Sequence, residues 1–200
     1  MPVKMSPVTG ATKEGDERRA LRRALIERRL ALADAECARL SAIVCQHLRQ
    51  RFPELAGWRV AFCWPVHNEP DLRPLISAWR AAGAPGFCAL LPVVVAAGAP
   101  LAFRAWTPHS RLAADRYGIP TPADGDFLTP QALLMPLNAF DAAGYRLGYG
   151  GGFFDRTLAA LKPAPLAIGV GFELARVASV VPEAHDVRLD AIVTEAGVFR

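Results

Sequence analysis

Apolar residues fall into two kinds of segment along this chain, short unbroken runs and longer stretches with helical spacing. Unbroken runs bounded by Gly, Pro or polar residues predict buried β-strands, and a spacing of three to four residues predicts amphipathic helices. The predicted strands are 58–64, 86–94, 101–106, 132–137, 165–172 and 190–194. Helices are predicted from Asp16 to about Leu32, from an N-cap at Asp34, over 69–83, and from about Phe153 to 162.

Strands and helices alternate over most of the chain, which favours an α/β fold with parallel strands and helices on both faces of the sheet. In the helix at 69–83, Pro70 is expected in the first turn and Gly83 at the end. The strand at 101–106 is expected near an edge, and the prolines of 115–122 predict a loop. Residues 1–15 lack periodicity and predict a disordered leader before a single domain over 16–200.

Charge is unevenly distributed along the 200 residues. The first 30 residues hold eight basic and four acidic residues, which accounts for the whole net charge of +4. A local excess of this kind argues against a nucleic-acid-binding module and favours a local anion site.

The cysteines and the apolar runs indicate the compartment. Cys37, Cys45, Cys63 and Cys88 form no C-x-x-C pair, so buried free thiols are expected. The N-terminus lacks the long apolar core of a signal peptide, and no apolar run approaches the length of a membrane span. We therefore expect a cytoplasmic protein without a membrane or nucleic-acid partner.

The segment GYRLGYGGGFFDR, residues 144–156, gives up side chains at four nearby positions, Gly148, Gly150, Gly151 and Gly152. It follows a predicted strand and leads into a predicted helix. A glycine-rich loop before a helix N-terminus offers backbone N–H groups and a positive dipole end to a phosphate. Arg146 can add a guanidinium, and Asp155 in the first turn can bind Mg²⁺.

Two common phosphate-binding templates do not fit this segment. A Walker A loop needs Lys-Ser or Lys-Thr after its last glycine, and none follows here. A dinucleotide-binding fingerprint that begins at Gly148 needs glycine where Phe153 stands. The residues alone therefore indicate a phosphate or nucleotide loop, with a flexible surface turn as the alternative.

The segment AFDAAGYRLGYGGGFFDRTL, residues 139–158, resembles the signature of the 5-formyltetrahydrofolate cyclo-ligase family, also called methenyltetrahydrofolate synthetases. The N-terminal basic helix and the segments NEPDL, YGIPTP and PEAHDVRLDAIVTE agree in order, so the resemblance spans about Arg18 to Glu195. It implies a three-layer α/β/α fold with a mostly parallel central sheet. It also implies an ATP- and Mg²⁺-dependent closure of 5-formyltetrahydrofolate to 5,10-methenyltetrahydrofolate through a phosphorylated formyl group.

The resemblance further implies roles for individual residues. Arg22 and Arg146 are expected to be catalytic, and Asp155 and Asp186 to bind Mg²⁺. Expected ATP contacts are Arg18, Arg19, Ala20, Leu21, Arg22, Arg146, Leu147, Gly148, Tyr149, Gly150, Gly151, Gly152, Phe153 and Phe154. Expected folate contacts are Arg22, Trp64, Glu69, Tyr149, Gly150, Gly151, Gly152 and Phe153. Arg18, Arg22 and Arg29 fall on one face of the predicted helix, and His67 and His185 are expected to be loop residues.

The chain departs from the family pattern at three places. Arg18 replaces a lysine, Phe153 and Phe154 replace two tyrosines, and Pro136-Leu137 replaces Pro-Gly. A non-catalytic folate- or nucleotide-binding protein, and a sugar-phosphate isomerase or acyl-transfer enzyme of similar fold, are the alternatives. A monomer or weak homodimer is expected.

Overall fold

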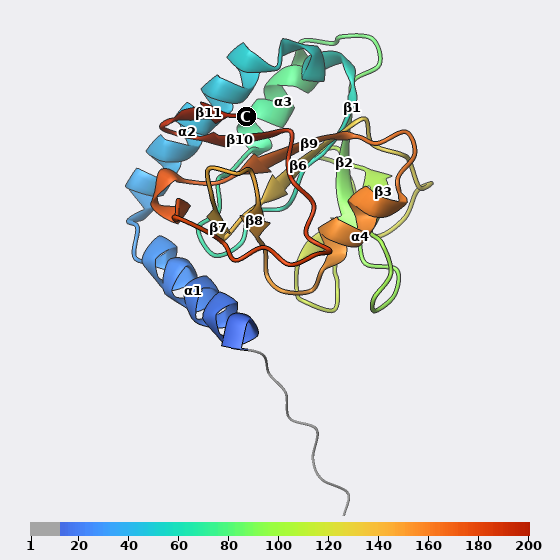
Figure 1. The fold of residues 1–200 in the computed structure, drawn as a ribbon. Coiled ribbons are helices and arrows are strands. Elements are labelled where there is room, and N and C mark those ends of the chain that lie inside the picture. Colours follow the sequence, from blue (N-terminus) through green and yellow to red (C-terminus); the bar gives the residue numbers. More distant parts are fainter. Residues whose placement is uncertain (1–12) are drawn as a thin grey trace, which may run out of the picture.

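The computed structural model describes residues 13–200, and its centre is a seven-stranded sheet (Figure 1). The strand order is β11-β10-β9-β6-β1-β2-β3. Neighbouring strands from β10 to β2 are parallel, and the edge strands β11 and β3 are antiparallel to their neighbours. The strands are β1 Arg59–Ala61, β2 Cys88–Val93, β3 Ala102–Ala105, β6 Ala132–Pro136, β9 Leu166–Val170, β10 Ala191–Thr194 and β11 Gly197–Phe199. The predicted α/β/α fold is confirmed.

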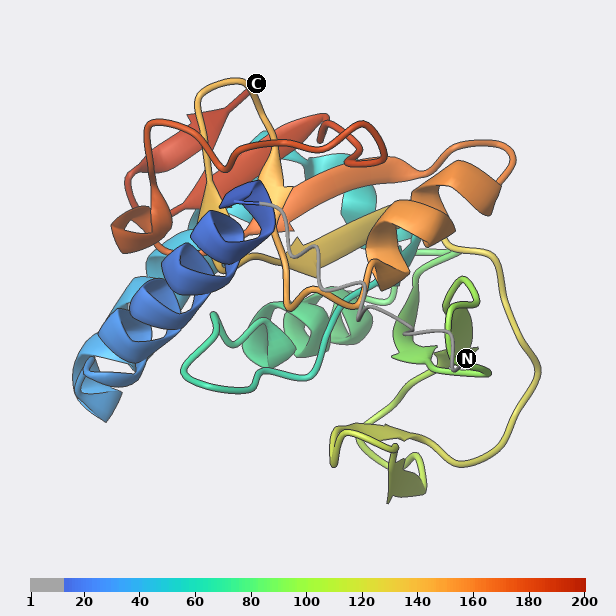
Figure 2. The ribbon, with the colours of Figure 1, turned by 60° about the horizontal axis from the view of Figure 1, so that its bottom comes forward.

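Helices cover both faces of this sheet because strand side chains alternate in direction. Along β6, Leu134 packs in one apolar cluster with helices α2 and α3, whereas Leu133 and Met135 pack in a second with α4. Figures 1 and 2 show α3 and α4 on opposite sides of the sheet. The helices are α1 Lys13–Leu30, α2 Asp34–Arg51, α3 Arg73–Ala81 and α4 Phe153–Ala160, with short 3₁₀ helices η1 Pro53–Gly57 and η2 Glu173–Ala175.

Helix α1 is held against a small hairpin instead of the central sheet. The hairpin consists of β7 Ala139–Phe140 and β8 Arg146–Leu147, which are antiparallel. Leu25 of α1 packs with Ala139, Leu147 and Val180 in a third apolar cluster. This packing fixes the basic helix beside the segment that leads into the glycines.

Several local expectations were wrong. Residues 115–122 do not form only a loop, because β5 Pro120–Pro122 pairs with β4 Leu112–Ala114 in a separate two-stranded sheet. Prolines are tolerated in such an edge pairing. Helix α3 begins at Arg73, so Pro74, rather than Pro70, lies in its first turn. Strands β4, β7, β8 and β11 were not predicted.

The N-terminal boundary also differs from the expectation. Helix α1 begins at Lys13, before the predicted start at Asp16. Residues 1–12 of the predicted leader lie outside the described residues. Between residues 13 and 200, no helix is both long enough and apolar enough to cross a membrane.

Candidate functional site

The predicted site residues come together at the carboxyl ends of the central parallel strands. Glu69 follows β1, the glycine segment follows β6, and Asp186 lies in the long connection between β9 and β10. Ligands of open α/β sheets bind at this edge. Helix α1 adds arginines from outside the sheet.

The face of α1 that carries Arg18, Arg22 and Arg29 is directed at the three segments of this edge. Arg18 contacts Asp186, Arg22 donates from Nε to the carbonyl of Gly148 at 2.6 Å, and Arg29 donates to the carbonyls of His67 and Leu137. The predicted common face of the three arginines is therefore confirmed. Partial burial of Arg22, together with the positive charges of Arg18 and Arg19, lowers the pKa of Arg22.

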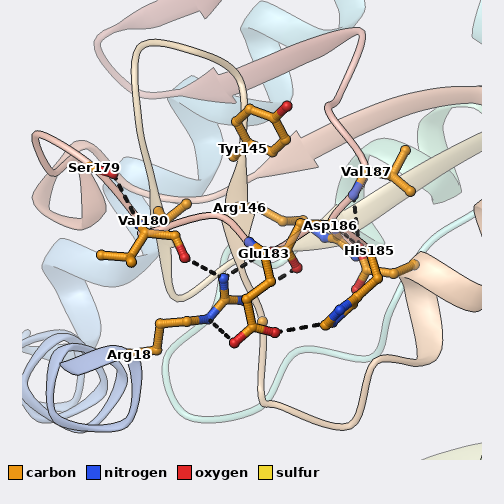
Figure 3. A network of polar contacts seen from close by, with 12 residues as sticks. Arg18, Tyr145, Arg146, Ser179, Val180, Glu183, His185, Asp186 and Val187 are labelled. Atoms are coloured by element: carbon orange, nitrogen blue, oxygen red, sulfur yellow. Dashed lines mark hydrogen bonds and ion pairs between the residues drawn. The ribbon is translucent and has the colours of Figure 1, made fainter. Parts of the chain in front are cut away.

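Arg18 forms a two-pronged ion pair with Asp186 (Figure 3). Its Nη1 lies 2.5 Å from one carboxylate oxygen and 2.7 Å from the carbonyl of Val181, and its Nη2 lies 3.2 Å from the other oxygen. Burial opposes ionisation of Asp186, yet the hydrogen bond and charge of Arg18 leave the pKa of Asp186 below its ordinary value. Val181, a β-branched residue, has a φ of 53°, which is strained. His185 beside Asp186 is a loop residue, as expected, and its Nε2 lies 3.4 Å from the carboxylate of Glu183.

The glycine segment combines two left-handed glycines with backbone N–H groups that the chain does not use. Gly150 and Gly152 have φ values of 91° and 63°, and Gly152 is the N-cap of α4. Within residues 13–200, the N–H groups of residues 148–152 donate no hydrogen bond to the chain. Unpaired N–H groups before a helix N-terminus favour an anion.

Gly152 and Gly148 provide a matched pair for a stability test. A Cβ at Gly152 would require a left-handed conformation and would meet Nη1 of Arg156 at 2.6 Å, whereas a Cβ at Gly148 meets nothing within 4 Å. We expect Gly152→Ala to lower the free energy of unfolding by about 1–2 kcal/mol, and Gly148→Ala to leave it unchanged or raise it by up to about 1 kcal/mol. Urea denaturation measures both. An equal effect of the two changes would contradict this account of the loop.

Arg146 and Asp155 form a second, largely buried ion pair at the other end of the segment. Nη1 of Arg146 donates to Oδ1 of Asp155 at 3.0 Å, and the N–H of Val187 lies 3.3 Å from the same oxygen. The Nε of Arg146 is buried and has no hydrogen-bond acceptor in the described part of the chain. A buried guanidinium with a free donor can bind an anion.

The two predicted metal ligands fit a nucleotide-bound cation better than a cation held by protein alone. The residues from 13 to 200 contain no group of three or more His, Cys, Asp or Glu side chains able to hold a metal ion. Mg²⁺ on a nucleotide needs only one or two carboxylates, since phosphates and water supply the rest. Asp155 and Asp186 lie in adjoining segments, because Val187 donates to Asp155. In this structure both carboxylates accept hydrogen bonds from arginines, Asp186 from Arg18 and Asp155 from Arg146.

Glu69 is buried, with 4% of its surface exposed, and belongs to a compact polar cluster. The hydroxyl of Tyr149 donates to its Oε1 at 2.6 Å, and Nη2 of Arg29 lies 3.9 Å from that oxygen. Burial raises the pKa of Glu69, although Tyr149 and Arg29 act in the opposite direction. Burial beside Glu69 also raises the pKa of Tyr149, which therefore stays a proton donor.

Aromatic residues expected at the site have protein partners of their own. The guanidinium of Arg73 lies 4.8 Å above the Trp64 ring, and Trp106 packs against it edge-on. Phe153 contacts Tyr117 edge-on. The Phe154 ring lies 5.9 Å from the guanidinium carbon of Arg146.

Leu137, which directly follows β6, is buried against β9. A Cβ at Gly169 would meet Cδ2 of Leu137 at 3.0 Å, and a Cβ at Gly171 would clash with Cδ1. The side chain therefore occupies space that these two glycines leave open.

The contact between Tyr149 and Glu69 was missed by sequence reasoning, and so was the part that Arg29 takes in it. The two residues are 80 positions apart, so no local pattern joins them. The sequence held one sign of the role of Arg29: it lies seven residues after Arg22 and therefore on the same face of the helix.

Comparison with known proteins supplies the family. Residues 14–195 match the model of the 5-formyltetrahydrofolate cyclo-ligase family. The chain is 33% identical over 184 residues to the 5-formyltetrahydrofolate cyclo-ligase of Escherichia coli K12, covering 86% of this chain and 97% of that one. The NMR structure of Aquifex aeolicus 5,10-methenyltetrahydrofolate synthetase is similar, with a TM-score of 0.78, 29% identity and coverage of 92% of both chains. The Mycoplasma pneumoniae 5,10-methenyltetrahydrofolate synthetase shares the fold, with a TM-score of 0.71, 21% identity and coverage of 90% and 99%.

Proposed function

This chain belongs to the 5-formyltetrahydrofolate cyclo-ligase family, and we propose that it closes 5-formyltetrahydrofolate to 5,10-methenyltetrahydrofolate with ATP and Mg²⁺, releasing ADP and phosphate. Its enzyme class, a ring-forming carbon–nitrogen ligase, follows from that membership.

One observation carries the proposal. A loop with unpaired N–H groups leads into α4, and arginines from α1 and β8 flank it. The same loop reaches the buried carboxylate of Glu69 through Tyr149. A polyphosphate site and a site for N–H donors, such as those of a reduced pterin, therefore adjoin.

The chemistry begins with a formamide carbonyl, which is a poor electrophile. The formyl oxygen attacks the γ-phosphorus of ATP, and the bond to ADP breaks. The N10 lone pair then attacks the activated formyl carbon. The carbon–oxygen bond breaks as phosphate leaves with the electron pair, and the N10 proton is lost. Phosphoryl transfer of this kind needs alignment and charge neutralisation more than a covalent residue.

The chain's own residues supply those two requirements. Arg18 and Arg22, which lie on α1, bind the phosphates of ATP. Arg146 stabilises the charge on the transferring phosphoryl group, and this effect is stronger for a buried guanidinium than for an exposed one. The loop N–H groups hold the phosphate chain. Glu69 accepts hydrogen bonds from the pterin and orients the formyl group.

Asp155 and Asp186 would hold Mg²⁺ together with the phosphates. The ion neutralises phosphate charge when it is bound. Since Arg18 contacts both oxygens of Asp186, nucleotide binding requires Arg18 to exchange Asp186 for phosphate oxygens.

The test is an absorbance assay for the methenyl product. Purified protein and 5-formyltetrahydrofolate are followed in the near ultraviolet with ATP and Mg²⁺ together, and then with each omitted. We expect product only when both are present. Product without ATP would overturn the phosphorylated intermediate. Folate binding without any product would support the non-catalytic binder, with Phe153 and Phe154 as the first residues to change to tyrosine.

A further inference from the structure

Arg29 is a buried cation that joins three segments of the site. Only 3% of its surface is exposed. Its Nε donates to the carbonyl of His67 at 2.7 Å, its Nη1 to the carbonyl of Leu137 at 3.1 Å, and its Nη2 to the hydroxyl of Tyr149 at 2.9 Å. The fixed fork of a guanidinium suits this arrangement, which an ammonium group cannot reproduce.

The hydroxyl of Tyr149 bridges Arg29 and Glu69. It accepts from Arg29 and donates to Oε1 of Glu69 at 2.6 Å. The other oxygen of Glu69 accepts from the N–H of Val66 at 3.1 Å. Both carboxylate oxygens are therefore fixed, one by the neighbouring backbone and one by the glycine loop.

The turn that carries Glu69 is strained and depends on the end of α1. His67 and Asn68 have φ values of 51° and 56°, a conformation that non-glycine residues rarely adopt twice in succession. Arg29 binds the carbonyl of His67, and Nδ2 of Asn68 donates to the carbonyl of Leu32 at 3.2 Å. Such strain persists only where the surroundings hold it.

From these contacts we propose that Arg29 is a positioning residue for folate, which acts through the Tyr149 hydroxyl to aim the Glu69 carboxylate and compensate its charge. The inference rests on the proposed function, in which Glu69 contacts the pterin. It makes the glycine loop part of the folate site through one side chain, Tyr149.

The groups that face Glu69 determine how its ionisation responds. Arg29 approaches from α1, Tyr149 from the glycine loop, and His67 from its own turn, and Cys63 lines the same small cavity as Glu69. Burial raises the pKa of Glu69, and Tyr149, Arg29 and His67 oppose that rise. Loss of Arg29 or of the Tyr149 hydroxyl must therefore raise the pKa further. Because a protonated Glu69 accepts fewer hydrogen bonds, folate binding should then weaken at a higher pH than in the wild type.

The experiment measures the Kd of 5-formyltetrahydrofolate by calorimetry without ATP, as a function of pH. The variants are Tyr149→Phe, Arg29→Gln and the double change, with Arg28→Gln, at an exposed neighbour on α1, as the matched control. We expect each single change to weaken binding about 10- to 100-fold, as for a lost hydrogen bond to a charged group. The acid limb of the binding curve should move to higher pH. The double change should weaken binding by less than the product of the two single effects, because the residues share one contact.

An unchanged Kd and acid limb in Tyr149→Phe, or strictly multiplicative effects in the double variant, would overturn the inference. Tyr149→Phe keeps the test decisive if Arg29→Gln fails to fold, since Tyr149 is 44% exposed and only its oxygen is lost. If the wild-type protein binds folate but makes no product, the proposed function is wrong. If the wild type turns over normally and the variants bind folate as it does, only the inference about Arg29 is wrong.

Discussion

Replacing Arg146 by glutamine is expected to lower kcat by about 1,000-fold, the loss seen when an arginine that stabilises phosphoryl transfer is removed. The guanidinium is buried and its Nε has no acceptor within the described chain. Glutamine keeps hydrogen-bonding capacity but removes the charge that the transition state needs. The KM for folate should change much less than kcat, since the lost interaction is made in the transition state.

Two measurements make this expectation decisive. Arg39→Gln removes another arginine that pairs with a carboxylate, Glu36, at 2.7 Å but on an exposed surface, and it should leave kcat unchanged. Thermal unfolding of Arg146→Gln separates a loss of catalysis from a loss of folding. A folded variant with wild-type kcat would remove Arg146 from the chemistry.

Replacing Asp155 by asparagine is expected to raise the half-saturating Mg²⁺ concentration about 100-fold or more. Loss of groups that merely support metal ligands already costs about 10- to 100-fold in metal affinity, and Asp155 is proposed as a direct ligand. Asparagine keeps one acceptor oxygen for Arg146 and Val187, so the local fold should persist. The measurement is the initial rate against Mg²⁺ concentration at saturating ATP.

Asp124→Asn is the matched control for this change. Asp124 also pairs with an arginine, Arg111 at 2.8 Å, but both side chains are exposed. Its replacement should not change the Mg²⁺ dependence. If Asp155→Asn required no more Mg²⁺ than the wild type, the metal would have to be held elsewhere.

The sequence predicted the parts of the site that depend on neighbouring residues. A buried strand, a glycine segment and a helix start are local features, and Gly152 does lie at the N-cap of α4. The common face of Arg18, Arg22 and Arg29 followed from the helical period alone. The apolar run at 132–137 predicted β6, because a strand buried on both faces needs apolar residues at every position.

Other parts could not be predicted because tertiary contacts decide them. Strands β7 and β8 have only two residues each and leave no recognisable period. The prolines of β5 argue against a strand in general, but an edge pairing of three residues accommodates them. The pairing of Tyr149 with Glu69, and of Arg18 with Asp186, joins residues that only the folded sheet brings together.

The packing of Leu137 on Gly169 and Gly171 couples the residue types that these three positions can hold. A Cβ at residue 171 and a leucine at residue 137 compete for the same volume. Glycine at 171 therefore leaves room for the leucine, and a side chain added at 171 would require Leu137 to move or to be replaced by a smaller residue. The two single substitutions destabilise the fold in different ways. A smaller residue at 137 leaves a cavity, whereas a side chain added at 171 overpacks the space that Leu137 fills. The two positions form one epistatic unit, which library designs for this enzyme should vary together.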